Sequence, residues 1–364
     1  MKEGQSLRNN GFWARLRGFR NAPTPDLPES YPACTHVILL DGTMSTLIPG
    51  EETNIGLTYR LLSELDPADN TLVYYEPGIQ WRGIKRALEV IAGIGINRTI
   101  KRSYLFLARN YRPGDQIYLM GYSRGAFAAR SLAGLIDAIG LLRKAQITEE
   151  MLERVYHLYR CDPRGAEARA LKLSRCHDGV SIKLVGVYDT VRALGIRWPI
   201  VWRLVPEAHS FHNHTLGPAT LNGRHALALN EPRFAYSPVL WQVLPERLPD
   251  IQQMWFRGTH GDIGGHLGGW NAARPLSNIP LIWMLSEAEA LGLRLPTGWQ
   301  DRFPIDPLAP SVGSWQGWAK ILWRRRRRKI GLDPSEFLHP SAKGSTTIPL
   351  PLPLPGVVVG EPAR

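Results

Sequence analysis

The residues best suited to chemistry lie in the segment Gly121-Tyr122-Ser123-Arg124-Gly125. An apolar run typical of a β-strand precedes it and an Ala-rich helical pattern follows it, which is the setting that the G-x-S-x-G motif requires. A serine hydroxyl becomes a nucleophile when it stands at an exposed sharp turn beside a base and oxyanion donors. Gly121 and Gly125 relieve the crowding of such a turn. We therefore predict that Ser123 is a nucleophile; a serine that only caps the next helix is the alternative.

A nucleophilic serine needs a histidine base, and the base needs an acid that orients it. The order Ser, Asp, His of α/β-hydrolases is matched by Ser123, Asp189 and His260. Asp189 directly follows an apolar run, where a buried carboxylate is costly without a partner. A helix N-cap is its alternative role. The glycine-rich segment 258–265 can fold tightly and present the ring of His260.

Other residues compete for the same roles. Asp262 is a second candidate for the orienting acid, or it caps backbone N–H groups of its loop. His266 is a weaker candidate for the base. The histidines at 209, 212 and 214 lack both a carboxylate set and a helical H-E-x-x-H frame, so the sequence favours no metal site and no cofactor.

The oxyanion formed by attack on an ester needs two backbone donors. We expect the N–H of Arg124, the residue after the nucleophile, and a second N–H from Gly42 or Thr43, which follow the first predicted strand. The side chain of Arg124 could bind a substrate phosphate or form an ion pair with an acid such as Asp262. Asp41, Gly121, Gly125 and Asp262 are predicted to support the site.

Alternating apolar runs and helical patterns must position these residues. They predict an α/β-hydrolase-like fold, a mostly parallel sheet with helices on both faces. The chemically important residues at 41–43, 123, 189 and 260 follow predicted strands, and ligands bind at the carboxyl ends of such strands. Residues 239–243 could form a strand or a loop, and 81–100 a loop or a short helix. The expected strands are 36–40, 71–75, the run from 116 to the nucleophile, 182–188 and 253–256; the expected helices are about 53–65, 101–111, 123–142, 148–160 and 276–291.

Composition limits the class of protein. The 364 residues are 44% hydrophobic, enough for a large core, and the net charge of +12 favours an anionic partner or surface. Three scattered cysteines indicate neither a disulfide framework nor a zinc knuckle, and they favour a reducing compartment. The basic N-terminal region lacks the apolar core of a signal peptide, and no apolar stretch is long enough to span a membrane. We expect a protein that is cytoplasmic as synthesised, with secretion by a non-Sec route or membrane association left open.

The C-terminal part combines aromatic residues at 315–323 with a cationic run, Arg324–Lys329. This combination suits peripheral binding to an anionic membrane; nucleic-acid binding, which we favour less, and a solvated loop are the alternatives. The expected organisation is an N-terminal arm (1–33), an α/β-hydrolase domain (34–300), a basic and aromatic segment (301–341) and a Pro-rich tail (342–364).

Residues 35 to about 295 resemble an uncharacterised α/β-hydrolase-domain family that includes phospholipase effectors of the bacterial type VI secretion system. The segments that carry this resemblance include Leu40–Thr43, Gly121–Ala126, Gly186–Val191 and Trp255–Gly265. The resemblance implies Ser123 as nucleophile, Asp189 as acid and His260 as base. The sequence departs from the family pattern at two positions: the family usually has Pro where Arg257 stands and a carboxylate where Asn230 stands. Because of these departures, the resemblance does not define the substrate pocket.

Together these features predict a serine hydrolase that cleaves an acyl ester, of a phospholipid or other lipid, through an acyl-enzyme. A soluble esterase or thioesterase on the same triad is one alternative, and a catalytically silent module that binds membranes or a partner protein is another. A secretion partner and an immunity partner are the protein partners that the resemblance suggests.

Overall fold

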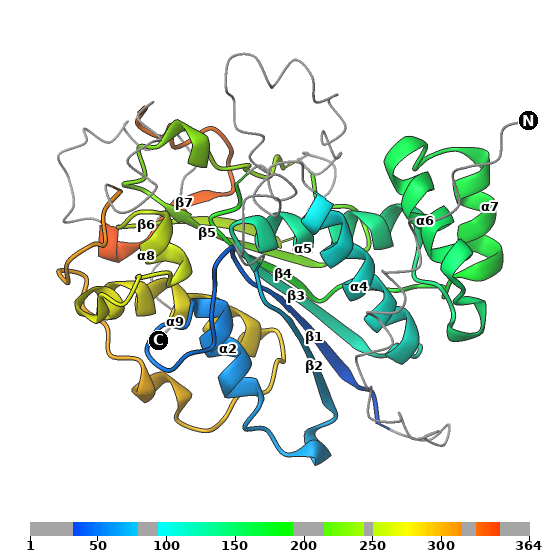
Figure 1. Cartoon of the computed structure of the whole chain (residues 1–364), viewed down its shortest axis with the longest axis horizontal. Helices are drawn as coiled ribbons and strands as arrows, with labels where there is room; N and C mark the ends of the chain where they lie inside the picture. The colour runs from blue at the N-terminus through cyan, green and yellow to red at the C-terminus, as the bar shows by residue number, and fades with distance from the viewer. Residues whose placement is uncertain (1–31, 79–93, 192–214, 244–249, 315–324, 343–364) are drawn as a thin grey trace, which may run out of the picture. The chain divides into compact units, whose positions relative to one another are not determined.

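A seven-stranded sheet organises the part of the chain that the structure, a computed structural model, describes: residues 32–78, 94–191, 215–243, 250–314 and 325–342. Neighbouring strands all run parallel, in the order β2-β1-β3-β4-β5-β6-β7 (Figure 1). The strands are β1 (Thr35–Leu40), β2 (Thr71–Glu76), β3 (Gln116–Tyr122), β4 (Leu184–Tyr188), β5 (Asn222–Ala228), β6 (Asp250–Phe256) and β7 (Glu336–Leu338).

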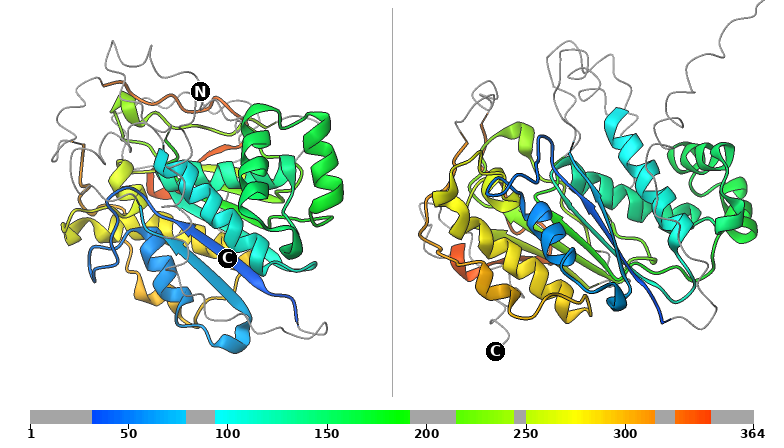
Figure 2. Two further views of the ribbon diagram at one scale, coloured as in Figure 1. Left: turned by 45° about the vertical axis from the view of Figure 1, so that its right-hand side comes forward. Right: turned by 60° about the horizontal axis from the view of Figure 1, so that its bottom comes forward.

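Helices cover both faces of this sheet (Figure 2). On one face α5 (Arg124–Ile139) packs on β1, β3 and β4, with α4 (Ile94–Asn110), α6 (Glu149–Cys161) and α7 (Ala166–Arg175) beside it. On the other face lie α2 (Asn54–Leu62), α8 (His260–Gly264) and α9 (Arg274–Ala290). The predicted α/β-hydrolase-like fold, a parallel sheet between two helical layers, is confirmed.

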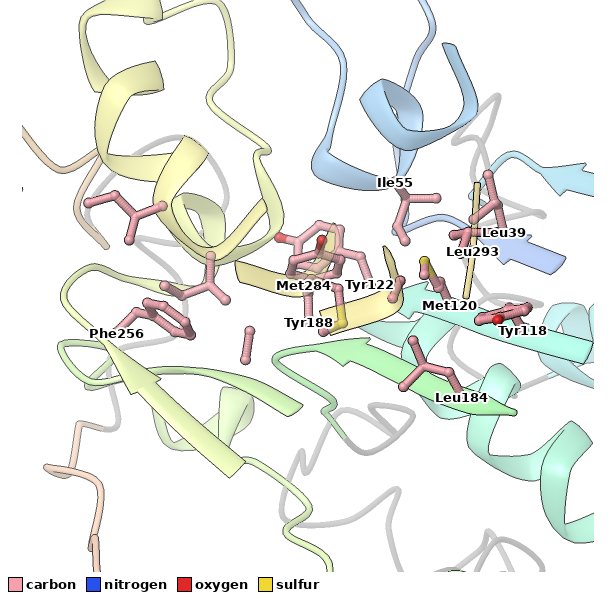
Figure 3. Close-up of a cluster of buried hydrophobic side chains, with 14 of the residues drawn as sticks. Leu39, Ile55, Tyr118, Met120, Tyr122, Leu184, Tyr188, Phe256, Met284 and Leu293 are labelled. Carbon is pink, nitrogen blue, oxygen red and sulfur yellow. The ribbon is translucent and has the colours of Figure 1, made fainter. Parts of the chain in front are cut away.

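The central strands are apolar on both sides because both of their faces are covered. Every residue of β4 is buried, as are all but the first of β1 and of β3. Alternate side chains, among them Leu39, Met120 and Tyr188, point into one cluster with Ile55 of α2 and Met284 of α9 (Figure 3). This packing holds the carboxyl ends of β3 and β4 in place.

Strand register brings the ends of β3, β4 and β5 to one edge. Tyr122 in β3 lies opposite Tyr188 in β4, which lies opposite Ala226 in β5. The two residues that follow, Ser123 and Asp189, therefore leave the sheet side by side, as expected for residues at the carboxyl ends of parallel strands.

Five predicted strands match β1, β2, β3, β4 and β6, whereas four elements were missed: α7, α8, β5 and β7. The helix expected from residue 101 begins at Ile94, so part of the segment 81–100 is helical; residues 79–93 lie outside the described residues. Residues 239–243, left open as strand or loop, form no strand. Through β7, part of the predicted C-terminal segment joins the sheet itself. Among the described helices, none is both long and apolar enough to cross a lipid bilayer.

Candidate active site

Ser123 stands in the tight turn between β3 and α5. Its backbone angles, φ 56° and ψ −116°, are strained for a residue with a side chain, at a cost on the order of 1–3 kcal/mol. The Ser123 N–H donates to the carbonyl of Tyr188 at 3.0 Å, which ties the turn to the neighbouring strand. Strain of this kind persists where the surrounding structure enforces it, and it is concentrated at active sites.

The two glycines of the motif are required by close backbone contacts. A Cβ atom on Gly121 would lie 2.5 Å from the carbonyl oxygen of Gly125. A Cβ atom on Gly125 would lie 2.0 Å from the carbonyl oxygen of Leu40 at the end of β1. Any larger residue at either place would push α5 away from the sheet and move Ser123.

His260 is the first residue of α8 and reaches back to Ser123. Its Nε2 atom is 2.9 Å from Ser123 Oγ, and its Nδ1 atom is 2.6 Å from Asp189 Oδ2. In the tautomer with the proton on Nδ1, that N–H donates to the carboxylate and Nε2 is left to accept the serine proton. The side chains of Ser123 and His260 are both largely buried: Ser123 is 7% exposed and His260 is 6% exposed.

Asp189 follows β4 with a left-handed backbone, φ 42°, and is completely buried. Its Oδ1 atom accepts the N–H of Ala228 at 3.0 Å. Burial alone would raise the pKa of this carboxyl group. The Arg328 guanidinium and the hydrogen bond with His260 outweigh burial, so the pKa of Asp189 lies well below its usual range. The group is therefore ionised, as an acid that orients an imidazole must be.

Asp262 has a different environment. Its carboxylate accepts hydrogen bonds from the N–H and hydroxyl of Thr259, the hydroxyl of Ser311 and the N–H of Val312, at 2.5–2.9 Å. Of the two roles that the sequence left open, these contacts match capping of the loop, because the ring of His260 is held by Asp189. The position beside Ser123 Oγ is occupied by His260 and not by His266.

The residues predicted as oxyanion donors lie at the turn after β1 and at the start of α5. The N–H of Gly42 already donates to Asp41 Oδ1 at 2.7 Å, which leaves the N–H groups of Thr43 and Arg124 as the candidates. Thr43, Arg124 and Gly125 line the same small cavity. Its volume of about 20 Å³ is enough for a water molecule.

The guanidinium of Arg124 forms no ion pair with Asp262 or with any other acid among the described residues. Burial lowers its pKa to about 10, so the side chain remains charged at neutral pH. Asp41 also lines the cavity, and it accepts hydrogen bonds from Thr53 and Tyr75 at 2.8 Å.

Sequence reasoning missed several residues around the imidazole. The rings of Tyr236 and Tyr122 contact the ring of His260, with centroids 4.6 and 4.9 Å away. Glu231 is buried and forms an ion pair with Arg233. Its carboxylate also accepts a hydrogen bond from the backbone N–H of His260 at 3.2 Å. No local sequence pattern assigned a role to Glu231 or Arg233.

Arg328 was also missed. It belongs to the cationic run that the sequence assigned to a lipid surface, yet its guanidinium contacts both oxygens of Asp189. The aromatic residues at 315–323 and the histidines at 209, 212 and 214 lie outside the described residues.

Comparison with known proteins identifies the family. Residues 35–287 match the family model described as the catalytic domain of Tle1-like phospholipase effectors of the type VI secretion system. The chain belongs to this family. An uncharacterised protein of Saccharomyces cerevisiae is 29% identical to this chain over 249 residues, which is 60% of this chain and 34% of the yeast protein.

Two solved structures are also similar to this chain. An uncharacterised protein from Pseudomonas aeruginosa is 14% identical with a TM-score of 0.41, and the match covers 75% of this chain and 49% of the other. The Tle1 effector bound to the VgrG spike of the type VI secretion system is 22% identical with a TM-score of 0.33, over 64% of this chain and 52% of the effector. The chain thus spans about a third of its curated yeast relative and about half of each solved structure.

Proposed function

We propose that this chain is a serine hydrolase that cleaves an acyl ester of a lipid, with phospholipids as the first substrate class to test. The observation that carries the reaction type is the continuous set of contacts from Ser123 Oγ to His260 and from His260 to Asp189, at 2.9 and 2.6 Å. Membership of a family described by its phospholipase effectors supports the lipid substrate.

In this mechanism His260 Nε2 takes the proton of Ser123 as Oγ attacks the ester carbonyl. Asp189 stabilises the imidazolium that forms. The backbone N–H groups of Arg124 and Thr43 donate to the oxyanion, and each such donor contributes about 3–4 kcal/mol. His260 then protonates the leaving alcohol, which gives an acyl-enzyme on Ser123. Water, deprotonated by the same imidazole, releases the fatty acid.

A fluorophosphonate probe tests the nucleophile, because it labels only activated serines. We expect labelling of the wild-type chain and its complete loss in Ser123→Ala, which removes one hydroxyl and leaves the turn intact. Ser174→Ala, at an exposed position of α7, is the matched control and should be labelled as the wild type is. Absence of labelling in the folded wild-type chain would favour a catalytically silent binding module.

The substrate class is tested by mass spectrometry of the products from mixed phospholipid vesicles, with wild type and Ser123→Ala compared. Release of fatty acid and lysophospholipid by the wild type alone supports the proposal. If a short soluble ester or thioester is hydrolysed and the rate does not rise when lipid micelles form, the same triad serves a soluble esterase or thioesterase.

Binding to an anionic membrane through the basic segment is part of this proposal. Arg326, Arg327 and Lys329 are exposed, and each cation near an anionic surface contributes about 1 kcal/mol. Sedimentation with vesicles should therefore increase with the fraction of anionic lipid; sedimentation that does not depend on it contradicts membrane binding. Family membership also supports a secretion partner and an immunity partner, and co-purification with a VgrG-type spike protein would test the first.

A further inference from the structure

Arg328 is one cation of the run Arg324–Lys329, but it is enclosed by protein. Its side chain is 4% exposed, whereas Arg326, Arg327 and Lys329 are exposed. A guanidinium is rarely buried without an acidic partner. Here the partner is Asp189, the residue that orients the imidazole of His260.

The guanidinium binds the carboxylate with both of its terminal nitrogens. Nη1 lies 2.5 Å from Oδ1 and Nη2 lies 2.9 Å from Oδ2 of Asp189. The same two nitrogens donate to the carbonyls of Ala228, at 2.9 Å, and Tyr236, at 2.6 Å. This planar, two-point contact fixes the orientation of the carboxylate in a way that a single contact does not.

The local backbone holds Arg328 at this place. Arg325 forms a β-bridge with Arg233, and the N–H of Arg326 donates to the carbonyl of Pro232 at 2.7 Å. Beyond Arg328, β7 pairs with β6 in the sheet. The segment that ends the described chain therefore crosses the loop after β5 and delivers one side chain to the triad.

We propose that Arg328 is a positioning residue of the triad, with two effects that act through Asp189. Its two terminal nitrogens hold the carboxylate so that Oδ2 of Asp189 stays directed at His260 Nδ1. Its positive charge offsets the negative charge of Asp189 and so disfavours protonation of His260, which extends the pH range of the base toward lower pH. The second effect follows because a carboxylate stabilises a neighbouring imidazolium only to the extent that its charge is not already balanced.

The structure sets the size of this effect. Arg328 is two hydrogen bonds from the imidazole, one of 2.9 Å and one of 2.6 Å. At such a separation and an effective permittivity of about 20, one unit charge shifts a titration by about one to two pH units. The inference rests on the proposed function for its catalytic consequence, but the titration of the ring is measurable without any substrate.

The test is an NMR titration of the histidine ring signals of the full chain, with the His260 signal assigned by its absence in His260→Gln. In Arg328→Met we expect the midpoint of the His260 titration to rise by one to two pH units. Arg328→Lys keeps a charge and should stay within about half a unit of the wild type. The control is Arg302→Met, which removes an arginine–carboxylate contact at an exposed site, where Nη1 of Arg302 contacts both oxygens of Glu64, and it should leave the midpoint unchanged.

Fluorophosphonate labelling of the same variants separates positioning from charge. At a pH at least two units above the midpoint measured for each variant, Arg328→Met should be labelled at least tenfold more slowly than the wild type. Arg328→Lys should also be slow, because an ammonium does not reproduce the two-point contact. Arg328→Gln replaces Arg328→Met if the latter does not fold.

A folded Arg328→Met or Arg328→Gln with an unchanged midpoint overturns the inference, even if the wild type is labelled at Ser123. A midpoint that moves equally in Arg328→Lys overturns the charge effect. If the midpoint rises as expected while no chain is labelled, the coupling of Arg328 to His260 stands and the proposed hydrolase function fails.

Discussion

Replacement of Gly125 by alanine should inactivate the chain without unfolding it. The added Cβ would lie 2.0 Å from the carbonyl oxygen of Leu40 and 2.6 Å from that of Asp41. Both oxygens belong to the backbone at the end of β1, so neither can rotate away, and the first turn of α5 must move by about 1 Å to restore ordinary contact distances. A displacement of this size in a catalytic group lowers the rate by about a hundredfold.

The rate constant for fluorophosphonate labelling of Ser123 measures this effect, and thermal unfolding shows whether the variant is folded. Gly114→Ala is the matched control: the same methyl group enters open space in the turn before β3, at φ 95°, and costs on the order of 1 kcal/mol. We expect labelling about a hundredfold slower in Gly125→Ala and near normal in Gly114→Ala. A folded Gly125→Ala that is labelled at the wild-type rate would refute the argument that this contact positions the nucleophile.

Three further substitutions probe buried carboxylates. Burial raises the pKa of Asp41 to about 6, so its stabilising contribution is present below about pH 4 and lost as the pH rises through 6. Relative to Asp41→Asn, the wild type should therefore lose about 2 kcal/mol of unfolding free energy between pH 4 and 7, measured by urea unfolding; a constant difference would contradict this. Asp262→Ala leaves four donors without their acceptor and should cost about 3 kcal/mol or more in the same assay. Asp189→Asn leaves Arg328 buried without a counter-charge and should cost about 3–5 kcal/mol as well as slowing labelling about 10⁴-fold; unchanged stability would show that the ion pair is not formed in solution.

The places of Ser123 and Asp189 at the ends of their strands could be predicted because each has a local cause in the sequence. Gly121 and Gly125 are needed wherever a strand turns sharply into a helix that packs against its neighbour. Asp189 directly ends an apolar strand, so its place at the edge of the sheet follows from the strand alone. Their mutual distances, by contrast, depend on strand order and register, which no single segment encodes.

Strand β5 could not be predicted because its burial is achieved with polar groups. Arg224 is 3% exposed and pairs with Asp250 and Glu287. His225 is fully buried, and its Nε2 atom accepts the N–H of Thr190. These partners come from other elements, so the segment itself shows neither a long apolar run nor a regular alternation of apolar and polar residues. Tertiary contacts, and not the intrinsic β-propensity of the segment, make it a strand.

The cationic run Arg324–Lys329 is a second case in which contacts with other elements decide where a polar side chain lies. Composition predicts that six consecutive cations face solvent or an anionic surface, and this holds for the exposed side chains of Arg326, Arg327 and Lys329. Arg328 differs only because the backbone around it is bound to the loop after β5, which turns this one side chain toward Asp189. As proposed, Arg328 acts on the triad while the exposed side chains of Arg326, Arg327 and Lys329 contact lipid headgroups. The two proposed roles have the same charge pattern in the sequence, and they are separated by the direction in which each side chain leaves the backbone, which is a property of the fold.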